Sequence, residues 1–136
     1  MNAFVLSYLS KGSSMNEIII YETLEGYSGF KEELENLARK SLHSKDARIQ
    51  LNQIILLLNL LQQNGTNLPI KIAKHIQDDI WELRPGHNRI LYFHFRDGKY
   101  IILHMFRKKT NKTPKREIEK AIKERNDFFQ RNGGES

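Results

Sequence analysis

Two arginines stand out because of their type and their spacing. Arg84 and Arg89 are separated by only four residues, and each lies at the end of a stretch that is typical of a β-strand. Two guanidinium groups held at adjacent strand ends can grip a phosphodiester through paired N–H donors. Alternatively, each arginine forms an ordinary ion pair with Glu82 or Asp79.

Lysines supply further candidates for binding a polyanion. Lys108, Lys109 and Lys112 follow the last predicted strand and lead into the final predicted helix. Lys71 and Lys74 precede the first strand of the same group. Their ammonium groups would extend a phosphate-binding surface; alternatively, they are solvated surface charges.

Other catalytic chemistries find little support in the sequence. The five histidines never occur at helical i, i+4 spacing with a glutamate, and the chain has no cysteine, which argues against a bound metal. Neither a glycine-rich phosphate loop nor a nucleophile elbow around a serine is present. We therefore expect no metal and no other cofactor.

The positive charge is concentrated near the C-terminus. The 136-residue chain has 22 Lys and Arg against 16 Asp and Glu, for a net charge of +6. Residues 104–131 alone carry ten basic and four acidic side chains, so this stretch accounts for the whole excess. A polyanion partner favours such a distribution; a solvated helix with a basic bias is the alternative.

The first half of the chain predicts a strand followed by two helices. Residues 17–21 are typical of a short strand. Apolar side chains at helical spacing predict one helix after an N-cap at Ser28 and a second over residues 44–63, ended by Gly65. The second helix is apolar on more than one face, which indicates burial between neighbours or, alternatively, a groove for a partner protein.

Three strands are predicted over residues 80–84, 89–96 and 99–107. The last two flank the dipeptide Asp-Gly, a strong signal for a two-residue hairpin loop. Both faces of this hairpin are apolar, so we expect it to be central in the sheet. The expected cross-strand pairs are Phe95 with Tyr100, Phe93 with Ile102, and Leu91 with His104.

A basic helix is predicted at the end, opening with Thr113 as N-cap and Pro114 at the first helical position. The order β-α-α-β-β-β-α predicts an α+β fold with a small, mainly antiparallel sheet. We expect one domain over residues 15–131, a peripheral extension over residues 1–14 and a flexible tail over residues 132–136.

Membrane insertion is not expected. The longest apolar run covers residues 54–58, far below the roughly 18–20 residues that span a bilayer. The apolar stretch near the N-terminus has no preceding Lys or Arg and no clear cleavage site, so it does not indicate a signal peptide.

Four motifs occur in a characteristic order. They are Trp81-Glu82-Leu83-Arg84, Arg89-Ile90-Leu91-Tyr92, Leu103-His104-Met105-Phe106 and Lys-Lys-Thr-Asn-Lys-Thr-Pro at residues 108–114. In this order they resemble the HigB-like toxins, a phage-derived group within the RelE superfamily. The resemblance covers roughly residues 16–130 and implies a RelE-like fold.

The resemblance also implies an activity. Such toxins belong to type II toxin–antitoxin pairs, and they typically enter the ribosomal A site and cleave mRNA without a metal, by attack of the ribose 2′-hydroxyl on the adjacent phosphate. Arg84 and Arg89 match the family's strand arginines and would stabilise the charge that grows on the phosphate. The general acid and base vary among these toxins. Tyr92 is a candidate or, alternatively, an aromatic side chain packed in the sheet; His104 is expected to be a core residue.

The resemblance implies partners and a location as well. The expected partners are mRNA, the ribosome and a cognate helix-turn-helix antitoxin, with DNA reached only through the antitoxin, in the cytoplasm. A non-catalytic module that binds nucleic acid or protein through the basic C-terminal surface is the alternative from a different functional class. New RNA 5′ ends inside translated frames would distinguish a nuclease from such a module.

Overall fold

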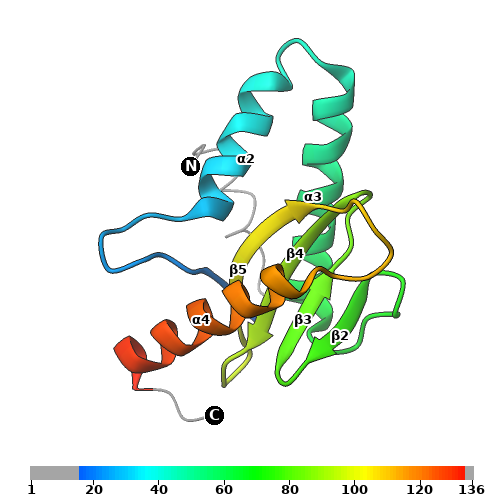
Figure 1. Cartoon of the computed structure of the whole chain (residues 1–136). Coiled ribbons are helices and arrows are strands. Elements are labelled where there is room, and N and C mark those ends of the chain that lie inside the picture. Colours follow the sequence, from blue (N-terminus) through cyan, green and yellow to red (C-terminus); the bar gives the residue numbers. More distant parts are fainter. Residues whose placement is uncertain (1–15, 134–136) are drawn as a thin grey trace.

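The structure, a computed structural model, describes residues 16–133 (Figure 1). The predicted extension over residues 1–14 and the last three residues of the predicted tail lie outside the described part. The elements are β1 (Glu17–Ile20), α2 (Gly29–Lys40), α3 (Lys45–Asn64), β2 (Ala73–Gln77), β3 (Ile80–Leu83), β4 (Asn88–His94), β5 (Lys99–Arg107) and α4 (Lys115–Asn132).

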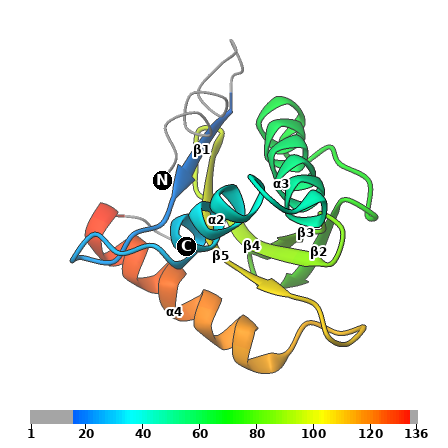
Figure 2. The same cartoon turned by 90° about the horizontal axis from the view of Figure 1, so that it is seen from above.

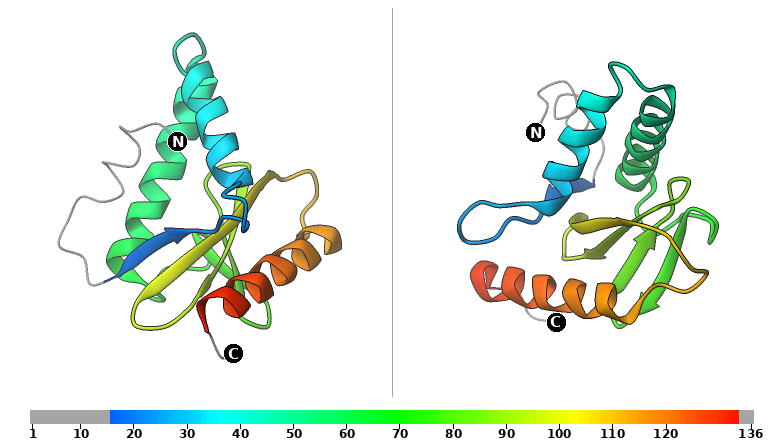
Figure 3. Two further views of the ribbon diagram at one scale, coloured as in Figure 1. Left: turned by 90° about the vertical axis from the view of Figure 1, so that its left-hand side faces the viewer. Right: turned by 45° about the horizontal axis from the view of Figure 1, so that its top comes forward.

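The elements form a five-stranded sheet with helices on both faces. The strand order is β1-β5-β4-β3-β2, in which β2 to β5 form an antiparallel meander and β1 pairs with β5 in parallel. Helices α2 and α3 lie on one face, and α4 lies across the other (Figures 2 and 3). The predicted α+β class with a mainly antiparallel sheet is confirmed. No helix within residues 16–133 is long and apolar enough to cross a bilayer.

Local signals at the helix ends are confirmed. The Ser28 hydroxyl accepts a hydrogen bond from the Lys31 amide, and the Ser44 hydroxyl accepts one from the Ala47 amide, so both serines are N-caps. Gly65 follows α3 with a φ of 57°. A Cβ atom at Gly65 would lie 2.8 Å from the Tyr100 hydroxyl, so this position needs glycine for space as well as for conformation.

Each face of the sheet has its own apolar core. Between the sheet and the α2–α3 pair, fully buried side chains such as Phe30, Leu58 and Ile102 pack together. Between the sheet and α4, a second cluster contains Phe93 and Phe128. The apolar face of α3 is buried as expected, although Leu56 remains 56% exposed.

A bulge changes the predicted register of the central hairpin. Leu91 pairs with His104 as expected, but Tyr92 pairs with Ile102 and Phe93 with Ile101, which leaves Leu103 as an extra residue in β5. The predicted pairs of Phe93 with Ile102 and of Phe95 with Tyr100 are therefore wrong, since His94 is the partner of Tyr100. The bulge directs both Leu103 and His104 toward α4.

Two further expectations are corrected by the structure. An additional edge strand, β2, precedes the three predicted strands; its side chains are mostly exposed and polar, so it lacks an apolar alternation. Thr113 is not the N-cap of α4, because Pro114 occupies that position without a side-chain cap. The Thr113 hydroxyl instead donates a hydrogen bond to Glu82 Oε1, 2.7 Å away, across the face of the sheet.

Candidate active site

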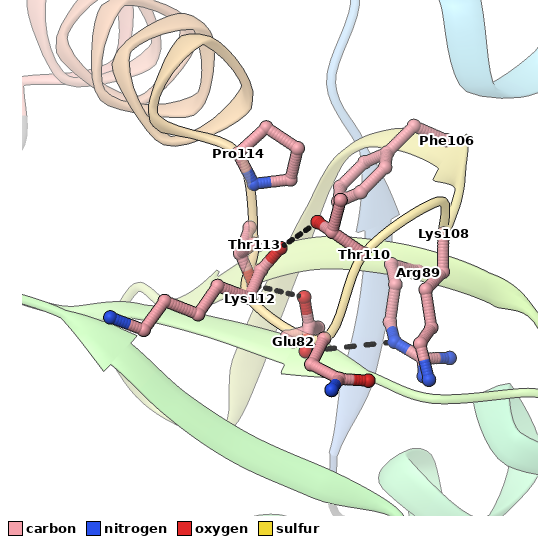
Figure 4. A pocket seen from close by; sticks show the side chains of 9 residues that line it. Glu82, Arg89, Phe106, Lys108, Thr110, Lys112, Thr113 and Pro114 are labelled. Atoms are coloured by element: carbon pink, nitrogen blue, oxygen red, sulfur yellow. Dashed lines mark hydrogen bonds and ion pairs between the residues drawn. The ribbon is translucent and has the colours of Figure 1, made fainter.

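A small pocket opens where the segment after β5 crosses the end of the sheet. Its lining includes Glu82, Arg89, Phe106, Lys108, Thr110, Asn111, Lys112, Thr113 and Pro114 (Figure 4). Residues two apart on a strand share a face, so β3 points Glu82 and the following Arg84 to the α4 side, where β4 also points Arg89. We call this site the arginine pocket.

Glu82 is the only carboxylate that lines the arginine pocket, and it is 2% exposed. Its Oε1 accepts the hydrogen bond from Thr113, and its Oε2 lies 3.4 Å from Arg84 Nε and 3.8 Å from Arg89 Nε. A buried carboxylate is stable only with such partners. The ion-pair alternative from the sequence is therefore present for both arginines, and it brings their two guanidinium groups together around one anion.

Arg89 is held rigidly by the backbone. Its Nη1 donates to the carbonyl oxygens of Gly86 and Asn88, each at 2.8 Å. Burial lowers the pKa of the Arg89 guanidinium, and the Glu82 carboxylate opposes this effect, while the nearby Arg84 charge adds to it. Arginine stays charged under any such shift. Gly86 has a φ of +61°, and a Cβ atom there would lie 2.5 Å from Gln53 Oε1, so the turn depends on glycine.

Arg84 is held less tightly. Its backbone N–H extends the sheet by donating to the Ile72 carbonyl at 2.9 Å. Its side chain is 24% exposed, and the buried Nε–H has no hydrogen-bond partner in the described part of the chain. This N–H has only the ion-pair contact with Glu82 Oε2 at 3.4 Å, and Arg84 lies beside the residues that line the arginine pocket rather than among them.

The structure brings some of the candidate lysines to the arginine pocket and leaves others outside. Lys108 and Lys112 line it. Lys74 is exposed and lies directly opposite Glu82 in the β2–β3 ladder, so it shares the same face. Lys109 is exposed and is not part of the lining, and Lys71 lies in the exposed turn before β2.

Tyr92 lies on the other face of the sheet from the two arginines. It is 3% exposed, belongs to the core beneath α2 and α3, and lies beside Tyr100. Burial raises the pKa of the Tyr92 phenol, and the negative charge of ionised Tyr100 would raise it further. The structure therefore does not bring Tyr92 together with Arg84 and Arg89.

His104 joins β5 to α4. It is 2% exposed, with Nδ1 2.5 Å from Glu124 Oε1 and Nε2 3.0 Å from Glu117 Oε1. Both ring nitrogens thus contact glutamates of α4, so His104 has a structural role in holding this helix to the sheet. Within residues 16–133, no group of three His, Cys, Asp or Glu side chains could hold a metal ion.

Two residues of the pocket were not singled out from the sequence. Glu82 shares a strand face with Arg84, and this period-two spacing is the signal that could have found it. The sequence around Thr113 predicted an N-cap instead of a site residue, because Thr before Pro is typical of a helix start. Only the tertiary structure shows that its hydroxyl is used by Glu82 instead.

A comparison with protein families identifies related sequences. The model of the family described as phage derived protein Gp49-like matches residues 40–126, which is more than half of the chain and includes every residue that lines the arginine pocket. A search of the curated proteins gives no match.

Proposed function

Because the chain belongs to the phage-derived Gp49-like family, which is toxin-like and related to RelE, we propose that it is the toxin of a type II toxin–antitoxin system and that it cleaves mRNA. The observation that carries the proposal is the arginine pocket. Arg89, Glu82, Lys108 and Lys112 line it, and Arg84 contacts the same Glu82 carboxylate from beside the pocket. Such a site favours a phosphate on which negative charge increases during reaction.

The reaction we propose is an internal transfer at phosphorus. The ribose 2′-oxygen forms a new bond to the adjacent phosphorus, the bond from phosphorus to the 5′-oxygen breaks, and the products are a 2′,3′-cyclic phosphate and a 5′-hydroxyl. Arg84 and Arg89 stabilise the extra charge on the phosphate oxygens. The Nε–H of Arg84 supports this role, because within the described residues it has an ion-pair contact with Glu82 but no hydrogen bond that must first be broken.

The reaction also needs a group that accepts a proton and a group that donates one, and other residues of the arginine pocket can fill these roles. Glu82 supplies the carboxylate that accepts the proton of the 2′-hydroxyl, and an ammonium group of Lys108 or Lys112 donates a proton to the leaving 5′-oxygen. Since Glu82 is almost fully buried, the segment over residues 108–114 must move aside for the ribose to reach it.

The expected partners follow from this proposal. The RelE-related toxins that the chain resembles act on mRNA in the ribosomal A site and are neutralised by antitoxins, here expected to be helix-turn-helix proteins that alone contact DNA. The net charge of +6 suits an RNA-rich environment such as the ribosome. We propose a cytoplasmic location for the same reason.

Mapping of RNA ends tests the proposal. Expression of the wild-type chain should produce new 5′-hydroxyl ends inside translated frames, and the purified protein with ribosomes should give 2′,3′-cyclic phosphates in the presence of EDTA. Glu82→Gln should lower the cleavage rate, because no carboxylate is left to accept the proton of the 2′-hydroxyl. Growth arrest without new ends would instead indicate the non-catalytic binding module, and no effect from a folded protein would contradict both functions.

A further inference from the structure

A second hollow lies on the opposite side of the same sheet end. Its volume is about 380 Å³, and residues of α2, α3, β4 and β5 line it. This size falls within the range of about 300–1,000 Å³ that is usual for small-molecule sites. We call it the helical groove, after the two helices that form one of its walls.

The alternation of side chains along the strands places the two sites back to back. Asn88 and Arg107 pair across β4 and β5 and both line the helical groove. Their chain neighbours, Arg89 and Lys108, line the arginine pocket on the other face. The two sites therefore lie at the same end of the β4–β5 pair, one on each face of the sheet.

The lining of the helical groove differs from that of the arginine pocket. Two cations, Lys40 and Arg107, are balanced by two carboxylates, Glu33 and Asp46, so the groove does not select for a phosphate. Its remaining polar groups are mainly side-chain amides, and apolar surface comes from side chains such as that of Met105. The Gln50 and Asn88 amides make hydrogen bonds within the chain, which leaves the amide N–H groups of Asn36 as the main candidate for contact with a ligand. An amide beside apolar surface suits a flat heterocycle with a hydrogen-bonding edge, which describes an unpaired nucleobase.

A hydrogen-bond network fixes part of this lining. Gln50 Oε1 accepts from Asn88 Nδ2 at 3.1 Å and from Arg107 Nη1 at 2.9 Å, while Gln50 Nε2 donates to Asp46 Oδ2 at 2.7 Å. These contacts tie α3 to the strand ends that carry Arg89 and Lys108. A ligand held against this network is therefore positioned relative to the arginine pocket.

We propose that the helical groove binds the nucleobase next to the scissile phosphate and thereby selects which RNA sequences are cleaved. The identity of the ligand as RNA rests on the proposed function. The placement of the ligand rests on the two back-to-back sites and on the neutral, amide-rich lining of the groove.

Nuclear magnetic resonance of the full chain tests the placement directly. The probes are inorganic phosphate and a set of RNA trinucleotides that lack the attacking 2′-hydroxyl and carry each of the four bases beside the central phosphate. Phosphate should shift the backbone amide signals of Lys108 and Thr110 alone. At least one trinucleotide should also shift the side-chain amide signals of Asn36 and Gln50. Trinucleotides that shift only the signals of the arginine pocket would overturn the inference.

A matched pair of variants tests selection during cleavage. Asn36→Ala removes an amide from the groove, whereas Asn52→Ala makes the same change on the exposed face of α3, outside the lining. Asn36→Ala should alter the base preference beside the cut by roughly fivefold or more, as expected for loss of one base contact, and Asn52→Ala should leave it unchanged. An unchanged preference in Asn36→Ala would overturn the inference.

The outcomes also separate this inference from the proposed function. If the wild-type chain cleaves RNA but no trinucleotide shifts the signals of the helical groove, the nuclease function is supported and the base site is refuted. Trinucleotide binding in both sites by a wild-type chain that cleaves no RNA would retain the base site and remove the nuclease function. Absence of any trinucleotide binding would overturn the base site, whatever the cleavage assay shows.

Discussion

Arg84 and Arg89 are both directed at Glu82, but they differ in how the fold holds them. Arg89 is buried and donates hydrogen bonds to two carbonyl oxygens, whereas Arg84 is partly exposed and its Nε–H makes no hydrogen bond within residues 16–133. A fixed guanidinium sets the geometry of a bound phosphate, and a less constrained one can adjust to it. The two arginines therefore contribute unequally to stability even where they contribute equally to catalysis.

Substitution of each arginine should reveal this difference. Arg84→Ala should lower the cleavage rate, because loss of one charge-stabilising donor costs about 2.7–4 kcal/mol in the transition state, or a hundredfold to a thousandfold. It should also lower Tm, because Arg84 is a partner of the buried Glu82 carboxylate, but by less than Arg89→Ala, which removes two backbone hydrogen bonds as well. Arg89→Ala should lower both the rate and the free energy of unfolding, the latter by about 1–3 kcal/mol, because Glu82 loses a buried partner. Arg116→Ala on exposed α4 is the control and should change neither. Full cleavage by folded Arg84→Ala would contradict the assigned role.

Thr113 holds the segment over residues 108–114 against the sheet. Thr113→Val keeps the shape but removes the hydrogen bond to the Glu82 carboxylate, so unfolding by urea should show a loss of about 1.5–3 kcal/mol. Thr110→Val is the matched control, because the Thr110 hydroxyl donates to an exposed carbonyl of Lys112. Equal losses in the two variants would show that the contact with Glu82 has no special weight.

At the scale of elements, polar contacts attach α4 to the sheet at several places, including an ion pair of Arg125 with Asp79. His104 of β5 lies between Glu117 and Glu124, and Tyr21, directly after β1, donates to Asp127 Oδ2 at 2.7 Å. Packing of Phe128 against Phe93 lies on the same face. The contacts tie α4 to two different strands, so they fix its direction across the sheet as well as its attachment.

Replacement of His104 tests how much its contacts with Glu117 and Glu124 stabilise the fold. His104→Leu should destabilise the fold by about 3 kcal/mol in urea unfolding, because two partly buried glutamates lose their common partner. Glu119→Gln, on the exposed side of α4, should have an effect within about 0.5 kcal/mol. A similarly small effect of His104→Leu would show that the contacts of His104 contribute little to holding α4.

The pH dependence of stability tests the hydrogen bond between Tyr21 and Asp127. Burial, followed by the hydrogen bond to Asp127, raises the pKa of Tyr21 to about 12. An unfolded tyrosine ionises near a pKa of about 10. Because the folded pKa is the higher one, the stabilisation is complete below pH 10 and is lost as the pH rises toward 12. Urea midpoints measured from pH 9 to 12 should fall more steeply for the wild type than for Tyr21→Phe; parallel curves would contradict this reading.

Features decided by neighbouring residues could be predicted from the sequence, and features decided across the fold could not. The caps at Ser28 and Ser44 and the pairing of Leu91 with His104 depend on local chemistry and were correct. The bulge at Leu103 depends on how β5 meets α4, so the remaining register was missed. In the site, the positions of Arg84 and Arg89 followed from strand ends, and the packed alternative for Tyr92 is the one that the structure shows. The hydrogen bond from Thr113 to Glu82 joins residues far apart in the chain and could not be predicted.

For the whole molecule, the charge distribution predicts a salt dependence of RNA binding. Lys108 and Lys112 line the arginine pocket and Lys109 lies between them in the chain, so neutralising all three should flatten the log–log salt slope by roughly two units if each contacts phosphate. A 2′-deoxy oligonucleotide that cannot be cleaved serves as the ligand. The matched control neutralises three exposed lysines of α4, namely Lys115, Lys120 and Lys123. An unchanged slope would place the phosphate contacts elsewhere, with Lys71 and Lys74 as the next candidates.

The parallel pairing of β1 with β5 has a consequence for the time at which the protein matures during its own synthesis. Residues 17–20 leave the ribosome first, yet their partners at residues 99–102 are among the last strand residues to be made. Until β5 arrives, β1 has no edge to join, and closing so long a loop is slow compared with forming the local meander. The arginine pocket, built from residues 82–114, needs only that meander and the segment after it. A nascent chain can thus assemble its candidate active site before its first strand has found its place.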